Sequence, residues 1–138
     1  MATALSNLSD FNPNEVPSGQ NYKVAIVVSE WNSQITEGLF LGAKEALIAC
    51  GMQEENILRS NVPGSFELVF GAKKALTKAV DAVIVIGSVI QGETKHFDFV
   101  CQGVTQGIVS LNLSSDRPVV FCVLTDNTLQ QAIDRSGG

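Results

Sequence analysis

Histidine and cysteine are scarce in this chain. Its 138 residues include one histidine and three cysteines, Cys50, Cys101 and Cys122. The cysteines are odd in number and widely spaced, and no C-x-x-C motif is present. A bound metal needs a cluster of such ligands, so no metal site is expected. Two of the cysteines lie in or beside apolar runs, which predicts buried free thiols in a reducing compartment.

Long apolar runs and positive charge are also missing. The longest apolar run, residues 82–90, is interrupted by Gly87 and Ser88, whereas a membrane helix needs roughly 20 apolar residues. Residues 1–20 are polar and contain no Lys or Arg, unlike a signal peptide. The net charge is −5, which opposes binding to nucleic acid or to an anionic membrane. We therefore expect a soluble, cytoplasmic protein with neither partner.

Strand-like and helix-like segments alternate after residue 20. The expected strands are residues 22–29, 56–62, 82–87 and 118–124. The first of them is nearly all apolar, as in a strand buried on both faces. The expected helices are residues 33–50, 65–79, 97–113 and 128–135. This alternation predicts a single α/β domain over residues 21–138, a four-stranded parallel sheet flanked by helices with flavodoxin-like layering. Residues 1–20, with Pro13 and Pro17, are expected to form an extended arm.

Helix ends are predicted from local residue types. Asn32 or Ser33 is expected to cap the first helix, and Gly51 to end it. Asp126 or Asn127 is expected to cap the last helix.

Ligands of such sheets bind outside the carboxyl ends of the strands. Three segments should therefore converge there, residues 29–32, 87–96 and 124–126, joined by the turn at residues 63–67.

His96 is the only histidine and follows the third predicted strand. Its imidazole suits proton transfer in both directions near neutral pH. A surface histidine without a role explains the residue equally well. The nearby Asp98 either orients the ring or favours the N-terminus of the following helix.

Trp31 is the only tryptophan and ends the first predicted strand. Its indole could stack on a flat heterocycle, although in isolation a partly buried packing residue is the better explanation. Arg135 could clamp a phosphate or complement the dipole of the last helix.

Polar residues at two turns offer further contacts. Residues 91–94 (QGET) precede a helix, where exposed N–H groups suit a phosphate, although such turns are common. Glu67 and Ser65 follow the Pro63-Gly64 turn, and they could bind sugar hydroxyls or serve only the first turn of a helix.

Three longer motifs occur in a definite order. They are V-P-G-S-F-E at residues 62–67, G-E-T-x-H-F-D at 92–98 and V-F-x-V-L-T-D-x-T-x-x-Q-A-I at 120–133. Together with their surroundings they make residues 24–138 resemble the lumazine synthases. The resemblance implies a cofactor-free condensation of 5-amino-6-(D-ribitylamino)uracil with 3,4-dihydroxy-2-butanone 4-phosphate. The product, 6,7-dimethyl-8-ribityllumazine, is the immediate precursor of riboflavin.

The resemblance also implies a site. The residues that it assigns to the pyrimidine and its ribityl chain are Trp31, Ser65, Phe66, Glu67, Ser88, Val89, Ile90 and Phe121. Those assigned to the phosphate are Glu93, Thr94 and Arg135, and His96 is the proton-transfer residue. Members of the family assemble as pentamers, and some as sixty-subunit icosahedral shells, with the active site between neighbouring subunits. Pro13 and Pro17 would limit strand pairing of the arm with a neighbour.

The chain departs from the family pattern at three places. Gln91 stands where the family often has Arg, and Lys95 where it often has Pro. By similarity, a G-N-K-G segment whose lysine helps to bind phosphate, and a final helix, would follow Gly138. We therefore expect the C-terminal helix of the fold to be missing from this chain.

Other proteins share the predicted fold. A phospho-receiver would need an Asp at the end of the third strand, where this chain has Gly87-Ser88. A flavodoxin would need a phosphate loop rich in Ser, Thr and Gly after the first strand, and residues 30–32 (EWN) do not form one. A non-catalytic lumazine or flavin binder, or a purely structural shell subunit of the same fold, stays an alternative.

Overall fold

The computed structural model describes residues 10–137. The first part of the predicted arm, residues 1–9, lies outside the described residues. In the described part of the arm, the Asn12 side chain caps a short 3-10 helix, η1 (Pro13–Glu15). No helix between residues 10 and 137 is long and apolar enough to cross a membrane.

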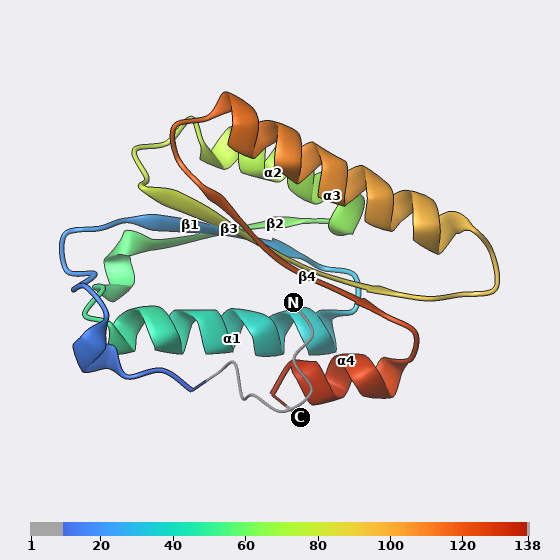
Figure 1. Cartoon of the computed structure of the whole chain (residues 1–138), viewed down its shortest axis with the longest axis horizontal. Coiled ribbons are helices and arrows are strands. Elements are labelled where there is room, and N and C mark those ends of the chain that lie inside the picture. The colour runs from blue at the N-terminus through green and yellow to red at the C-terminus, as the bar shows by residue number, and fades with distance from the viewer. Residues whose placement is uncertain (1–9, 138) are drawn as a thin grey trace.

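A four-stranded parallel sheet forms the centre of the molecule (Figure 1). The strand order is β2-β1-β3-β4, so β1 and β3 are the central strands. The strands are β1 (Val24–Ser29), β2 (Ile57–Val62), β3 (Ala82–Ile90) and β4 (Val119–Asp126).

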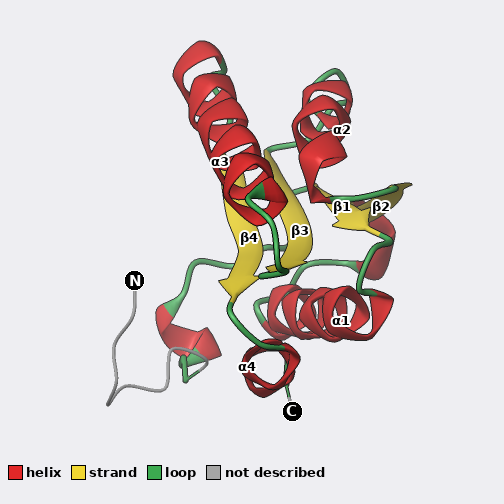
Figure 2. Cartoon of the chain, turned by 90° about the vertical axis from the view of Figure 1, so that its right-hand side faces the viewer, coloured by secondary structure: helices red, strands yellow, loops and turns green. Residues whose placement is uncertain are grey.

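Helices cover both faces of the sheet. One face carries α1 (Ser33–Ala49) and α4 (Leu129–Arg135), and the other carries α2 (Leu68–Ala75) and α3 (His96–Ser114) (Figure 2). Two 3-10 turns precede β2 and α2, namely η2 (Glu54–Asn56) and η3 (Ser65–Glu67). The predicted α/β fold, with its parallel sheet between two helical layers, is confirmed.

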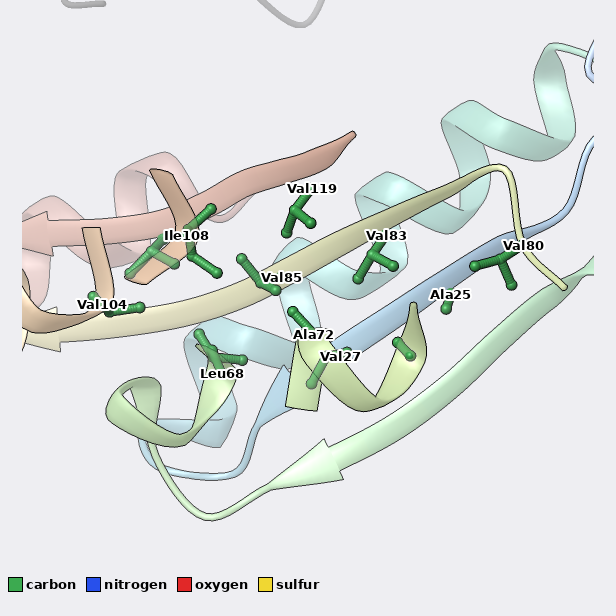
Figure 3. Close-up of a cluster of buried hydrophobic side chains, with 12 residues drawn as sticks. Ala25, Val27, Leu68, Ala72, Val80, Val83, Val85, Val104, Ile108 and Val119 are labelled. Atoms are coloured by element: carbon green, nitrogen blue, oxygen red, sulfur yellow. The ribbon is translucent and has the colours of Figure 1, made fainter. Parts of the chain in front are cut away.

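The core has one apolar cluster on each face of the sheet. Successive residues of β1 point to opposite faces, and all six are buried. Ala25 and Val27 join the cluster under α2 and α3 (Figure 3), and Ile26 joins the cluster over α1. Burial on both faces explains why β1 and β3 have nearly continuous apolar sequences.

The third strand is longer than predicted. It continues through Ile90, and its last residues pair with the end of β4, with Ile90 opposite Asp126. The Gln91 N–H then donates to the Asp126 carbonyl at 2.9 Å. The expected loop from residue 88 was wrong because the β4 backbone extends the ladder past the small residues Gly87 and Ser88.

The second helix is shorter than predicted, since η3 replaces its start and α2 ends at Ala75. The Arg117 guanidinium donates to the carbonyl oxygens of Leu76, Lys78 and Val80. These bonds satisfy carbonyls after the helix end, so the chain leaves the helix there.

The structure corrects two helix caps. Asp126 belongs to β4, and Thr128 caps α4 in a capping box with Gln131. Asn32 occupies the N-cap position of α1, but its side chain makes no capping bond. Gly51, with φ 95°, follows the end of α1 as predicted.

Candidate functional site

A cavity of about 680 Å³ opens at the carboxyl ends of the central strands. Its walls are Trp31 in the loop after β1, the turn after β2 with η3, the end of β3, and the loop before α3 with its first turn. The predicted site residues that line it are Trp31, Ser65, Phe66, Glu67, Ser88, Val89, Ile90, Thr94 and His96. The other lining residues are Gly64, Gly92, Phe97, Phe99 and Val100.

Trp31 projects from one wall of this cavity. Its residue is 72% exposed, so the indole is not the partly buried packing group that isolated reasoning favoured. Its backbone is fixed, because the Trp31 N–H donates to the Pro63 carbonyl at 3.0 Å and the Glu30 N–H to the Val62 carbonyl at 2.9 Å. The chain after β1 therefore runs alongside the turn after β2. The Trp31 indole presents a broad, solvent-exposed aromatic face to the cavity.

Two glycines set the position of η3. A Cβ at Gly87 would lie 2.5 Å from the Ser65 Oγ, and one at Gly103 would lie 2.8 Å from the Phe66 ring. The Ser65 side chain thus rests directly on the β3 backbone, and the Phe66 ring on that of α3. Glycine at these positions lets η3 approach both elements closely.

The hydroxyl groups of Ser65 and Ser88 have no hydrogen-bond partner among the described residues, although both atoms are buried. Ser65 is 6% exposed and Ser88 1%. A buried hydroxyl without a partner costs about 1–3 kcal/mol. Ser65 lines the cavity, so its free hydroxyl indicates a polar ligand or ordered water there. Ser88 follows Ile86 in the alternation of β3 and turns its hydroxyl toward the α1 face of the sheet instead.

His96 is the first residue of α3, and its imidazole lines the cavity. Its backbone N–H donates to the Thr94 Oγ1 at 3.4 Å. Neither ring nitrogen has a hydrogen-bond partner in residues 10–137, so Asp98 does not orient the ring. The N-terminus of α3 also places the positive end of its dipole beside Thr94. Two further N–H groups of its first turn, those of Asp98 and Phe99, donate to the Lys95 carbonyl.

Sequence reasoning missed the apolar first turn of α3. Phe97, Phe99 and Val100 line the cavity, and Phe99 is 68% exposed. The signal was present, since a helix that begins at His96 places apolar residues three or four positions apart on the same face as the imidazole.

Three predicted site residues lie outside this cavity. Glu93 is exposed in the loop before α3. Phe121 lies on the edge strand β4 and is 41% exposed. Arg135 ends α4, which packs on the opposite face of the sheet from α3 (Figure 2).

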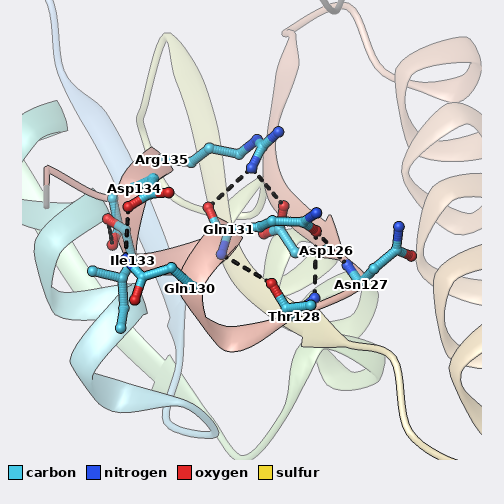
Figure 4. Close-up of polar contacts among 9 residues, drawn as sticks. Asp126, Asn127, Thr128, Gln130, Gln131, Ile133, Asp134 and Arg135 are labelled. Carbon is cyan, nitrogen blue, oxygen red and sulfur yellow. Dashed lines mark hydrogen bonds and ion pairs between the residues drawn. The ribbon is translucent and has the colours of Figure 1, made fainter.

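Arg135 is instead anchored within its own chain (Figure 4). Its Nη1 donates to the Gln131 carbonyl at 3.0 Å and lies 3.4 Å from the Asp126 carboxylate. The guanidinium thus complements the C-terminal end of α4. The arginine side chain stays 56% exposed, whereas that of Asp126 is 6% exposed.

Residues 124–126 converge with the end of β3 as predicted, since they pair with residues 88–90, but they do not line the cavity. Leu124 and Asp126 alternate with Phe121 and Val123 along the strand, and they face the layer of α1 and α4. The cavity lies toward α3 and η3.

The cysteines are half-buried and free, less enclosed than predicted. Burial raises the pKa of the Cys122 thiol, and burial together with the nearby Asp98 carboxylate raises that of Cys101. Among the described residues, no group of three or more His, Cys, Asp or Glu side chains could hold a metal ion.

Fold and cavity together define a class: a parallel α/β protein with an aromatic and polar binding site at the strand tips. The model of the 6,7-dimethyl-8-ribityllumazine synthase family matches residues 21–138. The chain belongs to this family of transferases, and its function is the condensation step that gives the lumazine in riboflavin biosynthesis.

Similar proteins agree with this assignment. A 6,7-dimethyl-8-ribityllumazine synthase of Flavobacterium johnsoniae is 65% identical over 100% of this chain and 73% of its own length. Those of Flavobacterium psychrophilum and Christiangramia forsetii are 60% and 58% identical over the whole chain, with 74% and 83% of their own lengths covered.

Proposed function

We propose that the cavity is the active site in which 5-amino-6-(D-ribitylamino)uracil condenses with 3,4-dihydroxy-2-butanone 4-phosphate. The observation that carries the proposal is the joint placement of Trp31, His96 and the unpartnered Ser65 hydroxyl around one space. The flat pyrimidine ring meets the Trp31 indole, the reacting groups meet the His96 imidazole, and the ribityl polyol meets the Ser65 hydroxyl.

The pyrimidine binds against Trp31. The exposed indole stacks on the uracil ring, while residues 88–90 run along the ring edge and offer backbone N–H and C=O groups. The ribityl chain extends over η3, where the Ser65 hydroxyl and the Glu67 carboxylate accept or donate bonds to its hydroxyls. Ribityl oxygens would give the Ser65 hydroxyl the partner that it lacks in the protein.

The phosphate of the second substrate binds at the N-terminus of α3. The positive end of the helix dipole favours an anion at this end, and Thr94 lies in the cavity wall. Glu93 belongs to the same turn and helps to shape it. Lys95, at the N-cap position of α3, adds a positive charge close by.

His96 moves protons between the reacting groups. The amino group of the pyrimidine attacks the ketone and forms an imine with loss of water, and inorganic phosphate then leaves. The ribitylamino nitrogen closes the ring on the remaining carbonyl with loss of a second water. Each step needs a proton removed from nitrogen or carbon, or delivered to oxygen. A positioned base contributes on the order of 10²–10⁴ in rate, and holding the two reactants together contributes roughly 7–11 kcal/mol.

Phe121 and Arg135 reach the active site of a neighbouring copy rather than their own. Both are partly exposed, at 41% for Phe121 and 56% for the Arg135 side chain. Placed across a subunit interface, the aromatic ring closes the pocket and the guanidinium clamps the phosphate in a bidentate manner. We propose a cytoplasmic homopentamer, with a sixty-subunit shell as its larger form. Residues 21–138 are its catalytic unit and residues 1–20 its arm.

Substrate mixing with two Trp31 variants tests this proposal. The wild type should produce lumazine fluorescence when both substrates are added, and the pyrimidine should quench the indole emission. Trp31→Ala should raise the KM for the pyrimidine at least about tenfold through loss of stacking and apolar contact. Trp31→Phe, the matched control, keeps a stacking ring and should stay close to the wild type. Binding without product would identify a lumazine or flavin binder instead.

A further inference from the structure

Asn32 adopts a left-handed backbone conformation. With φ 58° and ψ 48° it is the one non-glycine residue with positive φ among residues 10–137. A left-handed conformation is uncommon outside glycine, although Asn tolerates it better than most residues. It occurs here immediately after Trp31.

The Asn32 side chain spans two strands. Its Nδ2 donates to the Ser88 carbonyl at 3.0 Å instead of capping α1. The register between β1 and β3 ends at Val28 opposite Ile86, so the two strands have separated before this point. The carboxamide therefore replaces the backbone ladder where the ladder stops, at the mouth of the cavity.

Asn32 does not itself line the cavity, but both groups that it connects do. Trp31 is its chain neighbour, and Ser88 belongs to the end of the adjacent strand β3. The indole is 72% exposed, so few protein atoms restrain it. Its position depends on its backbone, which is fixed to Pro63 on one side and, through Asn32, to Ser88 on the other.

We propose that Asn32 is a positioning residue: its left-handed turn and its carboxamide bond to Ser88 set the height and angle of the Trp31 indole over the end of β3. The inference rests on the proposed function for the identity of the stacked ring. The restraint on the indole exists without any ligand. A preorganised stacking face avoids the entropic cost of ordering the ring on binding.

Three variants distinguish the contribution of the left-handed backbone from that of the carboxamide bond to Ser88. Asn32→Gly keeps the left-handed backbone without strain and removes the carboxamide. Asn32→Asp keeps the size but cannot donate to the Ser88 carbonyl. Asn32→Ala loses the bond and strains the turn. Ser33→Ala, at the exposed next residue, is the matched control.

The readout is the fluorescence anisotropy of the only tryptophan, measured on the ligand-free protein. We expect Asn32→Gly and Asn32→Asp to lower it through faster local motion of the indole, with unchanged unfolding midpoints for Asn32→Gly. We also expect a Kd for 5-amino-6-(D-ribitylamino)uracil raised roughly five- to tenfold, with kcat at saturation within about twofold. Ser33→Ala should match the wild type in all three measurements.

Wild-type anisotropy in Asn32→Gly, with only Asn32→Ala impaired, would overturn the role of the carboxamide. Wild-type behaviour of all three variants would overturn the whole inference. Failure of the pyrimidine to quench the wild-type indole would count against the proposed function alone, because the anisotropy of the free protein needs no substrate.

Discussion

Gly87→Ala perturbs the contact on which the cavity wall is built. The added Cβ would lie 2.5 Å from the Ser65 Oγ, 2.9 Å from the Leu68 Cδ1 and 3.2 Å from the Ser65 Cβ. Ordinary contact begins near 3.4 Å, so these groups must move by several tenths of an ångström. They have no room, because Ser65 is 6% and Leu68 0% exposed.

The magnitude follows from two opposing effects. Inserting a methyl group into a packed core costs about 1–3 kcal/mol. Replacing glycine lowers the entropy of the unfolded chain and returns about 0.4–1 kcal/mol. We expect a net loss of about 1–2 kcal/mol in the free energy of unfolding. Activity should fall as well, since η3 is pushed away from β3 together with the groups that we propose bind the ribityl chain.

Urea denaturation at matched protomer concentration measures this loss. The control is Gly42→Ala, where an added Cβ on α1 meets nothing within 4 Å. That variant should gain roughly 0.5–1 kcal/mol through helix propensity. If Gly87→Ala proved as stable as the wild type, or if both variants lost the same amount, the close-approach argument would be refuted.

Three further predictions concern charge and protonation. His96→Ala should lower kcat on the order of 10²–10⁴ in a steady-state assay while pyrimidine binding, followed by indole quenching, stays unchanged; equal loss of both would make His96 a binding residue. The hydrogen bond from Arg59 lowers the pKa of the Glu37 carboxyl below 4.5, so the pair stabilises the fold above that pH and less as the pH falls through the lowered pKa. In urea titrations Glu37→Gln should therefore cost about 0.2–1 kcal/mol near neutral pH and nothing near pH ~2; a gap that persists in acid would contradict this. Because burial raises the pKa of Cys122, iodoacetamide should label it more slowly in the native than in the unfolded chain at mildly alkaline pH, as followed by mass spectrometry, and equal rates would exclude the shift.

The fold was predictable because its strongest signals are local. β1 and β3 are buried on both faces and therefore carry apolar runs that few other structures require. Gly51 marked the end of α1 for a similar reason, since it alone supplies the positive φ there. The T-x-x-Q pattern at residues 128–131 was also readable as a capping box, and should have displaced Asp126 as the expected cap.

Features that depend on distant partners were not predictable. The end of α2 is set by Arg117, which approaches from the start of β4. The Asn32 carboxamide does not cap α1 but donates to the carbonyl of Ser88, which lies 56 residues away in the sequence. Single-sequence patterns carry no information on such long-range bonds.

The candidate site shows the same difference between features set locally and features set by distant partners. Residues at the ends of β1 and β3 and after β2 came together as predicted, because the carboxyl ends of parallel strands share one edge. Arg135 did not join them because α4 packs on the other face of the sheet. Phe121 did not join them because it lies on β4, an edge strand of the sheet. The order of the motifs along the chain does not reveal on which face of the sheet a side chain lies.

Mixing inactive subunits tests the central claim, an active site formed by His96 of one copy and Arg135 of the next. His96→Ala and Arg135→Ala would be purified separately, dissociated, mixed in equal amounts and reassembled. In a closed ring of identical interfaces, random mixing leaves about a quarter of the sites with both residues intact. Lumazine should therefore form at about that fraction of the wild-type rate. Activity of the mixture no higher than that of the separate variants would contradict it.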